Sequence, residues 1–388
     1  MMFNKMPPEI SDYSSKSPLI EIIEKISNEC IRCSKCLDEC AYIRKHGKPK
    51  DIADSCNPLD PATLEIAFEC SLCGLCEAVC PVNIDPVSMF IEMRREATKQ
   101  DKEILKDYAG LISYENTGTS KRYSWYGFPK RCDSIFFPGC TLAGTRPEAT
   151  FMLYQYLKKA VPDIGIVLDC CAKPSHDLGR EEYFSSMLGE MKSWLMYHGI
   201  KHIYAACPNC YRVFKDYGKE FSIHTVYELI AEKGIPENLK VSGNITVHDP
   251  CVIRHESKIH ASVREIIRQS GLQITEMPHS GKNTVCCGEG GAVRNQSPVL
   301  AQSWINIRKN ENKDLRVITY CAGCAGKLSA EMPSGHILDL LFDPEAVTAG
   351  KEKVSRPPFT YWNRLRLKKK LKKEQGIIII REREYFPR

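Results

Sequence analysis

The sequence of 388 residues lacks the apolar segments that membrane-spanning and secreted proteins carry. Its longest uncharged apolar run falls well short of the roughly 18–20 residues that cross a bilayer. No basic segment followed by an apolar stretch and a cleavage site opens it, so we expect no secretory signal. A G-x-G-x-x-G string between a strand and a helix is also absent, as is a Walker A string, so we expect no dinucleotide or nucleotide phosphate to bind. These absences favour a cytoplasmic protein, or one peripheral on the cytoplasmic face of the membrane.

The charge is unevenly distributed along the chain. Residues 351–388 hold 13 Lys and Arg against 4 Asp and Glu, so this segment carries +9 although the whole chain carries +6. The first 350 residues are therefore at −3, which argues against a nucleic-acid scaffold with a basic stripe on its folded domains. Leu365, Leu367 and Leu371 interrupt the basic run from Arg364 to Lys373. We expect either a solvated helical tail or a basic amphipathic segment that rests on an anionic membrane surface or an acidic partner.

The 20 cysteines are the dominant feature of the sequence, and they form four groups and two strays. Two groups share the spacing C-x2-C-x2-C-x3-C, and their members are Cys30, Cys33, Cys36 and Cys40, then Cys70, Cys73, Cys76 and Cys80. The third group is Cys140, Cys170, Cys171, Cys207 and Cys210. The fourth repeats that order with Cys251, Cys286, Cys287, Cys321 and Cys324. The strays are Cys132 and Cys56, and we expect Cys56 to be a spare buried thiol.

Three chemistries compete for so many thiols. Disulfides need an oxidising compartment and are typical of short secreted chains, which this one is not. Zinc sites typically use two separated C-x2-C hooks, whereas each of the first two groups packs its four cysteines into one compact run. That run is the one that holds [4Fe–4S] clusters in bacterial ferredoxins. The first two groups therefore predict two cubane [4Fe–4S] clusters, and a zinc-binding interaction protein is the least favoured alternative.

The spacing also predicts which cysteines share a cluster. Three thiolates of one tight turn occupy three corners of a cubane, and the fourth cysteine of the run ligates the other cluster in two-cluster ferredoxins. We therefore expect Cys80 to join Cys30, Cys33 and Cys36, and Cys40 to join Cys70, Cys73 and Cys76. Two departures from the ferredoxin pattern remove no ligand: Ala41 stands where a proline is usual, and a long insert separates the motifs.

The two later groups form an internal repeat. The offsets between matching cysteines are 111, 116 and 114 residues, counted from Cys140 to Cys251, from Cys171 to Cys287 and from Cys207 to Cys321. Nearly constant offsets indicate two copies of one unit, related by a pseudo-twofold. The cysteines follow β-like runs, and helical patterns lie between them; the runs are 134–137, 203–206, 245–248 and 317–320. Alternating strands and helices predict α/β units with a mainly parallel sheet, and a metal site at the carboxyl ends of its strands.

Five cysteines per copy exceed the four that a cubane or a zinc ion takes. Adjacent cysteines point to opposite faces of an extended strand, so both reach one site only at a sharp turn. Lys173-Pro174 follows the first pair and Gly288-Glu-Gly-Gly291 follows the second, and both can supply that turn. Either one thiol per copy is spare, or the cluster is unusual and uses all five.

The doubled pattern C-x(29–34)-CC-x(33–35)-C-x2-C resembles the CCG domain of heterodisulfide reductases. The matching strings are FFPGC at 136–140, ACPNCY at 206–211, HDPC at 248–251, CCGEGG at 286–291 and YCAGC at 320–324. A ferredoxin-type region ahead of two such units resembles the D subunit of the methanogen enzyme, and is similar to the fused B and C subunits of the soluble enzyme. The resemblance covers residues 28–345, with one departure at Ala172, where glycine normally follows the cysteine pair.

The resemblance implies that each five-cysteine set binds a further, non-cubane [4Fe–4S] cluster and is catalytic. The residues so assigned are Cys140, Cys170, Cys171, Cys207, Cys210, Cys251, Cys286, Cys287, Cys321 and Cys324. It further implies that a disulfide or thiol small molecule reacts between these clusters, one electron at a time. The alternative is a pure relay, because the same fold serves as the iron–sulfur subunit of anaerobic glycerol-3-phosphate, glycolate and lactate dehydrogenases. The expected redox partner is a flavoprotein, a ferredoxin-like donor or a membrane cytochrome.

Polar residues beside the paired cysteines each have a functional and a structural interpretation. His176, Asp177, His248 and Asp249 either donate protons and tune potentials, or form turns and pack. The same choice applies to Lys173, Glu289 and Arg294. Backbone N–H groups of a glycine-rich turn would offset thiolate charge, so we assign a cofactor-binding role to Gly288, Gly290 and Gly291.

Together these features predict an α+β protein. A mainly helical ferredoxin-type domain with two [4Fe–4S] clusters precedes two duplicated Rossmann-like α/β CCG units. The expected segments are an N-terminal segment 1–27, the dicluster domain 28–115, CCG units 132–235 and 244–345, and a basic tail 351–388.

Overall fold

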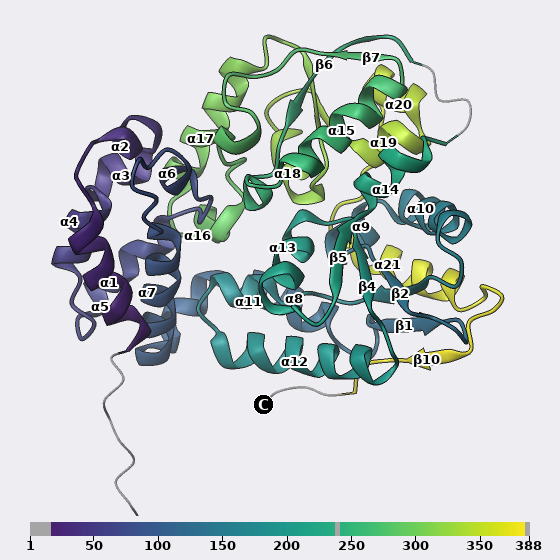
Figure 1. Ribbon diagram of the computed structural model, residues 1–388, viewed down its shortest axis with the longest axis horizontal. Helices are drawn as coiled ribbons and strands as arrows, with labels where there is room; N and C mark the ends of the chain where they lie inside the picture. The colour runs from purple at the N-terminus through teal and green to yellow at the C-terminus, as the bar shows by residue number, and fades with distance from the viewer. Residues whose placement is uncertain (1–16, 237–240, 385–388) are drawn as a thin grey trace, which may run out of the picture.

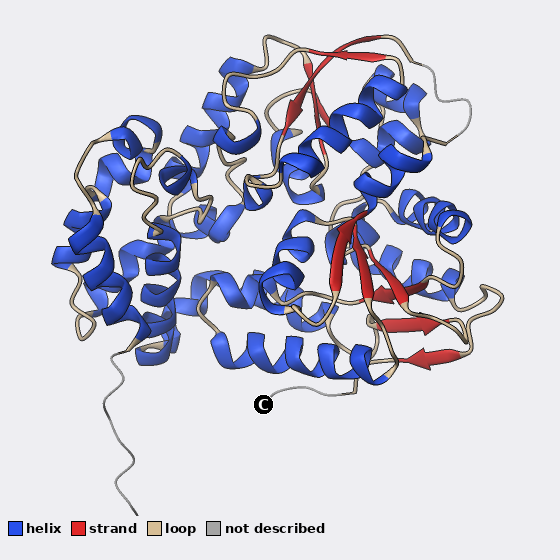
Figure 2. Ribbon diagram, viewed as in Figure 1, coloured by secondary structure: helices blue, strands red, loops and turns tan. Residues whose placement is uncertain are grey.

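The computed structural model describes residues 17–236 and 241–384. A helical N-terminal lobe packs against two α/β lobes that follow it in the chain (Figure 1). Strands occur in the two α/β lobes, and the N-terminal lobe is built of helices and loops (Figure 2). The predicted α+β class, with a helical dicluster region ahead of parallel α/β units, is confirmed.

The N-terminal lobe consists of short helices, several of which start with a proline behind a capping side chain. The Ser17 hydroxyl accepts from Ile20 N ahead of Pro18, and the Asp85 carboxylate accepts from Ser88 N ahead of Pro86. The helices are α1 (Pro18–Glu29), α2 (Lys35–Glu39), α3 (Ala41–His46), α4 (Pro49–Ser55), α5 (Pro61–Glu65), η1 (Ile66–Glu69), α6 (Leu75–Ala78), α7 (Pro86–Gln100) and η2 (Lys102–Tyr108). The next helix, α8 (Ala109–Gly118), packs against the first α/β lobe, where the Glu115 carboxylate accepts from Ser175 N at 3.1 Å.

The first α/β lobe is built on a six-stranded sheet in the order β10-β1-β3-β2-β4-β5. Strands β3, β2, β4 and β5 pair in parallel, whereas β1 is antiparallel to both of its neighbours. Its strands are β1 (Trp125–Phe128), β2 (Ser134–Phe137), β3 (Gly165–Leu168), β4 (His202–Ala205) and β5 (Ser222–Thr225). Its helices are α9 (Cys140–Thr145), α10 (Pro147–Ala160), α11 (Lys173–Asp177), α12 (Glu181–Tyr197), α13 (Pro208–Tyr217) and α14 (Val226–Lys233).

The second lobe repeats the parallel part of this sheet in the order β7-β6-β8-β9. Its strands are β6 (Gly243–His248), β7 (Leu272–Ile274), β8 (Arg316–Thr319) and β9 (Ser334–His336). Its helices are η3 (Cys251–Ile253), α15 (Ser257–Gln269), η4 (Gly281–Asn283), η5 (Gly290–Ala292), α16 (Val293–Gln296), α17 (Pro298–Glu311), α18 (Ala322–Leu328), α19 (Ile337–Phe342) and α20 (Pro344–Ala349). The duplication is visible in a detail: α14 and α19 both open with a capping box, Thr225 with Glu228 and His336 with Asp339.

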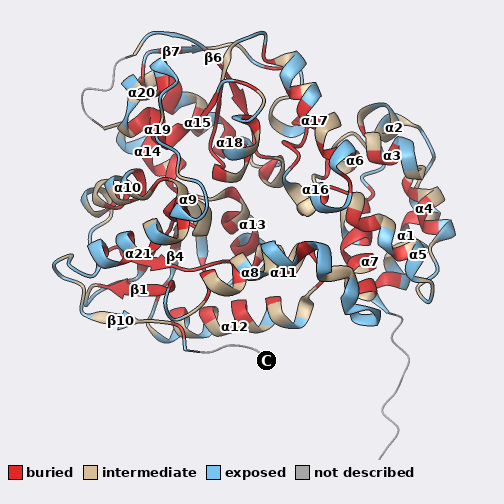
Figure 3. Ribbon diagram, turned by 180° about the vertical axis from the view of Figure 1, so that it is seen from behind, coloured by how far each residue is buried: buried red, intermediate tan, exposed pale blue. Residues whose placement is uncertain are grey.

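The lobes share their hydrophobic cores. One cluster of buried side chains runs from Phe136 of the first sheet to Val247 and Ile318 of the second. Another joins the N-terminal lobe to the second α/β lobe and includes Phe68, Phe90 and Trp304. Viewed from behind, the inner helix faces and the central strands β1, β2 and β3 are buried, and exposed residues lie on the outer surface (Figure 3). Shared cores hold the cysteine groups of the three lobes in fixed relation to one another.

The basic C-terminal segment differs from the solvated or membrane-resting tail that the sequence predicts. It forms α21 (Phe359–Leu371), which packs against α9 and α10, and β10 (Ile379–Arg381), which pairs with β1. Lys368 is buried and its Nζ donates to the carbonyls of Lys121, Arg122 and Ser124 at 2.9–3.0 Å. Arg383 is fully buried and pairs with Asp169 at 2.8 Å. The segment belongs to the first α/β lobe because its cations satisfy buried carbonyls and a buried carboxylate.

A chain that ends at Arg356 is therefore expected to be unstable. The truncation would expose the edge of β1, leave Asp169 buried without its cation and uncover the face of α9. Loss of one partner of a buried ion pair alone costs about 3–5 kcal/mol. We expect the truncated chain to be largely insoluble, or to melt well below the full chain in a thermal scan followed by circular dichroism. Melting at the same temperature would contradict this account of the segment.

None of the described helices combines the length and the hydropathy needed to cross a membrane.

Candidate metal centres

The two ferredoxin-type motifs fold into matching turns. Arg32 and Leu72, each just before the second cysteine of its motif, have φ angles of 54° and 53°. Ser34 and Gly74, each just after that cysteine, have φ angles of 71° and 72°. A non-glycine residue in this left-handed region costs about 1–2 kcal/mol, so three such residues at matching positions indicate a constrained site. Successive turns of this kind aim backbone N–H groups into a concavity that suits an anionic group.

The fold brings the predicted fourth cysteine of each motif to the other motif. Burial and the neighbouring thiols of Cys30, Cys33 and Cys80 raise the pKa of Cys36 to about 11. In the same way burial and the thiol of Cys73 raise the pKa of Cys40 to about 12. The first set lines a cavity of about 20 Å³ whose wall includes Cys30, Cys33, Cys36, Cys76 and Cys80. The second set gathers Cys40, Cys70, Cys73 and Cys76, and burial together with the neighbouring thiols of the set raises the pKa values of Cys70 and Cys76.

The five cysteines of the first α/β lobe form one chain of sulfur contacts. The order of contact is Cys140, Cys170, Cys171, Cys210 and Cys207. Hydrogen bonds from Cys170 and Cys210 lower the pKa of Cys171 to about 6. Gly139 has a φ of 80°, and a Cβ there would lie 2.9 Å from the Cβ of Cys207, so only glycine fits beside the cysteines. Ala172 adopts a φ of 56°, the conformation that a glycine after the cysteine pair would favour.

The five cysteines of the second lobe make the same chain, in the order Cys251, Cys286, Cys287, Cys324 and Cys321. The sulfurs of Cys287 and Cys324 lie 3.1 Å apart. The backbone N–H of Gly288 donates to Cys286 Sγ at 3.3 Å, and that of Gly290 also stabilises the Cys286 thiolate. In both lobes the adjacent cysteines thus reach one site at a sharp turn, and all five sulfurs belong to the cluster of contacts.

Two of the three glycines after Cys287 also allow the second lobe to approach the dicluster motif. A Cβ on Gly290 would lie 2.4 Å from Ser71 O, and a Cβ on Gly291 would lie 2.6 Å from Cys70 O. A side chain at either position would therefore push the two cysteine sites apart. On Gly288, where φ is 81°, a Cβ would lie 2.9 Å from Ala301 O of α17, so this glycine allows close packing within the second lobe.

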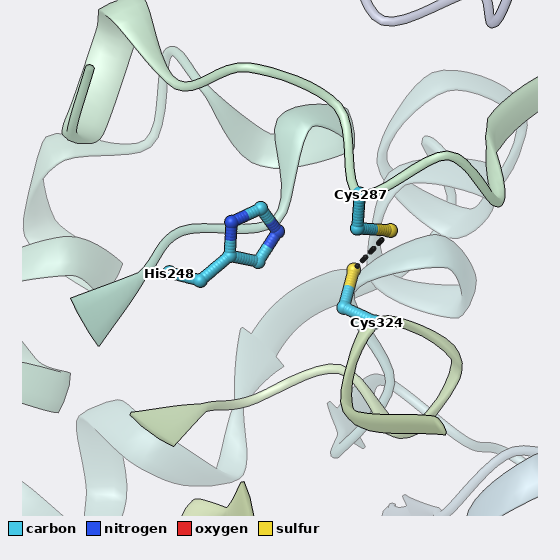
Figure 4. Close-up of side chains that lie close together, drawn as sticks. All are labelled: His248, Cys287 and Cys324. Atoms are coloured by element: carbon cyan, nitrogen blue, oxygen red, sulfur yellow. Dashed lines mark hydrogen bonds between the residues drawn. The ribbon is translucent and has the colours of Figure 1, made fainter. Parts of the chain in front are cut away.

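The second site contains a buried histidine. His248 is fully buried, and its ring nitrogen, Cys287 Sγ and Cys324 Sγ all lie within 4.8 Å of one another (Figure 4). Neither ring nitrogen has a hydrogen-bond partner among the described residues. Burial, followed by the charge of Arg308, lowers the pKa of His248 to about 3, so the ring is neutral at physiological pH. Phe137 stands at the matching position three residues before Cys140, so the two sites differ here.

The other polar residues near the paired cysteines have protein partners. The Asp249 carboxylate accepts from Arg264 and from the Tyr320 hydroxyl at 2.8–2.9 Å. Asp177 accepts from Lys173 and His176, and the remaining His176 nitrogen lies 2.8 Å from the Tyr217 hydroxyl. Glu289 pairs with Lys327 at 3.1 Å, and Arg294 is exposed. These contacts support the structural interpretation of Asp249 and Asp177.

The cysteine sites are contiguous. The Cys36 thiol of the first dicluster set is one of the groups that raise the pKa of Cys76 in the second dicluster set. The Cys73 thiol of the second dicluster set is likewise one of the groups that raise the pKa of Cys251 in the second α/β lobe. Cys73 and Cys251 also line one cleft of about 270 Å³. The Tyr227 hydroxyl donates to Ala206 O at 2.8 Å and to Tyr320 O at 3.0 Å. Those carbonyls immediately precede Cys207 and Cys321, so Tyr227 lies between the sites of the two α/β lobes.

Arg94 of α7 joins the three lobes, and no sequence pattern points to it. Its guanidinium is fully buried and donates to the carbonyls of Ala67 and Cys70 at 2.6–3.1 Å. It also donates to Asp177 O at 2.6 Å in the first α/β lobe and to Gly291 O at 2.9 Å in the second. The sequence pattern likewise gave no sign of Tyr227, because a lone arginine or tyrosine whose partners are backbone carbonyls has no sequence pattern.

Cys56 and Cys132 lie outside the four sets, and Cys132 donates to Ser134 O at 3.2 Å.

Comparison with known proteins agrees with this architecture. The chain matches the 4Fe-4S dicluster domain over residues 29–85, and the cysteine-rich (CCG) domain over residues 135–215 and 245–329. It therefore belongs to the iron–sulfur proteins in which a 4Fe-4S dicluster domain precedes two cysteine-rich domains. The limits of the three domain matches lie within the broader segments that the sequence predicts.

Two similar proteins are named as subunits of reductases, and a third is named as an oxidoreductase. The B subunit of fumarate reductase (CoM/CoB) from Methanothermobacter marburgensis is 25% identical, covering 76% of this chain and 66% of its own. The D subunit of dihydromethanophenazine:CoB–CoM heterodisulfide reductase from Methanosarcina barkeri is 23% identical, covering 77% of this chain and 88% of its own. EtfAB:quinone oxidoreductase of Syntrophomonas wolfei is 21% identical, covering 68% and 48%. The chain thus spans about two thirds of the length of the first of these relatives and about half of the length of the third.

Proposed function

We propose that this chain is an iron–sulfur oxidoreductase subunit that carries electrons between a partner protein and a disulfide or thiol substrate. The observation that carries the proposal is the unbroken series of four cysteine sites, from the two dicluster sets through Cys251 to the site beyond Tyr227. Four clustered thiols in left-handed turns suit a cubane [4Fe–4S] cluster, and five suit a second kind of cluster. Ligand thiols must lose their protons, and a bound metal ion would favour the thiolates that burial otherwise disfavours.

Each of the four cysteine sets would hold one cluster. Cys30, Cys33, Cys36 and Cys80 would hold one cubane, and Cys40, Cys70, Cys73 and Cys76 the other. The two five-cysteine sets would hold the remaining clusters, and all four clusters would supply one-electron steps when bound. Reduction of a disulfide takes two electrons and two protons and yields two thiols, so two successive one-electron deliveries complete it. The electrons would come from a flavoprotein, a ferredoxin-like donor or a membrane cytochrome.

The experiment that tests this proposal adds a thiol to oxidised, anaerobically purified protein and freezes the mixture within milliseconds. If the cysteine-rich sites bind thiols, 2-mercaptoethanol should produce a new paramagnetic signal, whereas ethylene glycol, which lacks the sulfur, should not. A second candidate function is that of an electron relay, in which the substrate reacts in a partner protein and not on this chain. The similarity to EtfAB:quinone oxidoreductase supports this candidate. A relay would give identical spectra with both additives while keeping its full iron content.

His248 leads to a prediction about the second five-cysteine site. Its neutral ring can donate one N–H to sulfur at this site, and such hydrogen bonds raise the potentials of iron–sulfur centres. His248→Phe removes the donor and copies the ring that Phe137 provides in the first lobe, so the fold should tolerate it. One hydrogen bond of about 1 kcal/mol corresponds to about 40 mV for one electron. Redox titration followed by electron paramagnetic resonance should show one centre shifted down by about that amount; four unchanged potentials would refute the assignment.

A further inference from the structure

A groove of about 850 Å³, with no cysteine in its lining, lies on the surface formed by α10, α19, α21 and the segment that links α20 to α21. These helices lie together beyond the first sheet, on the side away from the N-terminal lobe (Figure 1). Its apolar lining includes Pro147, Met152, Leu338, Phe342 and Leu367. A volume of this size accommodates a short peptide segment or a ligand of similar bulk.

The acidic side chains that line this groove are all engaged. Glu148 accepts from Lys370 at 2.8 Å, and Asp339 accepts from the buried Arg146 at 2.7–2.9 Å. Glu352 pairs with Arg316, and Asp343 caps α20 by accepting from Ala346 N. Three of the four carboxylates are therefore paired with cations of the protein itself, and the fourth, Asp343, is held by a backbone N–H group.

Four basic side chains of the same groove are not engaged. Lys353, Arg366, Lys369 and Lys373 are exposed, and none has a hydrogen-bond or ion-pair partner for its side chain within residues 17–236 and 241–384. Trp362, which is 63% exposed, Arg366 and Lys369 follow one another at helical spacing along α21, and Lys373 continues this row two residues past the end of that helix. The groove thus combines an apolar floor with uncompensated positive charge and a neighbouring exposed tryptophan.

We propose that this groove is the docking site for an acidic segment of a partner protein. Apolar side chains of the segment would contact Met152 and Phe342, and its carboxylates would pair with the free cations of α21. A flat anionic membrane would reach the outer row but not the recessed floor, and the polar phosphate backbone of a nucleic acid would leave that apolar floor without an apolar partner. An acidic peptide therefore fits the mixture of charge and apolar surface better than either.

The position of the groove suits a redox partner. Helix α21 packs against α9, which begins at Cys140, and Asn363 Nδ2 donates to Gly144 O at 3.0 Å. The next residues of the chain, Arg146 and Pro147, already line the groove. Arg364 is close enough to Cys140 for its charge to act on the Cys140 thiol. The use of this surface for electron exchange rests on the proposed function, whereas its capacity to bind an acidic segment does not.

The test measures binding of a fluorescein-labelled peptide of alternating Glu-Glu and Leu-Leu pairs to the anaerobically purified full chain. Fluorescence anisotropy at low salt should show binding that weakens as salt rises. The charge-reversed variant R366E/K369E/K373E should bind at least about tenfold more weakly, because each free cation is replaced by a repelling charge. The matched control K219E/K258E/K309E reverses three exposed lysines elsewhere and should change the affinity less than about twofold. Met152→Glu should also weaken binding, because it places a charge on the apolar floor.

The results separate this inference from the proposed function. Equal peptide binding by the wild type and R366E/K369E/K373E would overturn the inference, provided that both melt at the same temperature. So would a wild type that ignores the peptide but sediments with phosphatidylglycerol vesicles through the same three residues. Iron is measured in the same samples: peptide binding by iron-free protein would leave the docking site standing and refute the cluster assignment. Iron-loaded protein that fails to bind the peptide would refute the docking site and leave the cluster assignment standing.

Discussion

Replacing Cys286 and Cys287 together by serine should remove about one quarter of the iron bound to the chain, if each of the four sites holds one [4Fe–4S] cluster. Both side chains are buried in the middle of the sulfur chain, where Cys286 contacts Cys251 and Cys287 contacts Cys324 at 3.1 Å. Serine oxygen is a poor ligand for such a cluster, and the two ends of the set cannot bridge the gap alone. The matching C170S/C171S variant should lose a similar quarter, and the variant with all four changes should keep about half.

The strays supply the control for this experiment. C56S/C132S also removes two thiols, but Cys56 and Cys132 lie outside the four sets, and Cys132 only donates to Ser134 O. Its iron content should equal that of the wild type when both are prepared without oxygen. Iron and acid-labile sulfide are measured per chain in all variants. A C286S/C287S protein with undiminished iron would show that the vicinal pair does not hold a metal centre.

Replacing Arg94 by methionine should destabilise the folded chain strongly. The guanidinium makes five hydrogen bonds to four carbonyl groups in the three lobes. Methionine fills part of the volume but leaves these buried carbonyls without donors, and an unsatisfied buried group costs about 1–3 kcal/mol. Not all four losses will add, so we expect a destabilisation of roughly 4 kcal/mol or more and a thermal midpoint lower by at least several degrees.

Two variants distinguish the network from the charge. Arg94→Lys keeps the cation but cannot reach four carbonyls at once, so it should recover only part of the loss. Arg95→Met removes a neighbouring arginine that is part-exposed and pairs with Glu92 and Glu181, and it should cost about 1 kcal/mol or less. The chain has several lobes, so limited proteolysis complements the thermal scan, and cleavage between residues 85 and 125 should appear first in Arg94→Met. Equal stability of R94M and R95M would contradict a joining role for Arg94.

The cysteine sets were predictable because short spacings in the chain fix their local geometry. Three cysteines separated by two residues each must share one turn, and a doubled pattern with constant offset must build two similar sites. The strands that precede Cys140, Cys207, Cys251 and Cys321 were predictable for the same reason, because their β-like runs are local. The exchange of Cys40 and Cys80 between motifs followed from ferredoxin chemistry, and the fold brings these thiols together in that way.

The joints between the lobes could not be predicted, because their partners are backbone carbonyls far away in sequence. Arg94 bonds to Gly291 O across 197 positions, and Lys368 bonds to Lys121 O across 247. A run of lysines and leucines near the end of a chain resembles a solvated or membrane-bound helix, and only the tertiary structure shows which cations are buried. Sequence patterns report on local geometry and on periodic burial, whereas these contacts depend on how separate units meet.

The central claim is that four metal sites lie in series along one chain. Mössbauer spectroscopy of anaerobically purified, iron-57-enriched protein, combined with iron, sulfide and zinc analysis, tests it most directly. The account predicts about sixteen irons per chain, nearly as much sulfide and no stoichiometric zinc, with two populations that correspond to cubane and non-cubane centres. A chain that carries zinc in place of iron, or no more iron than two cubanes require, would contradict it.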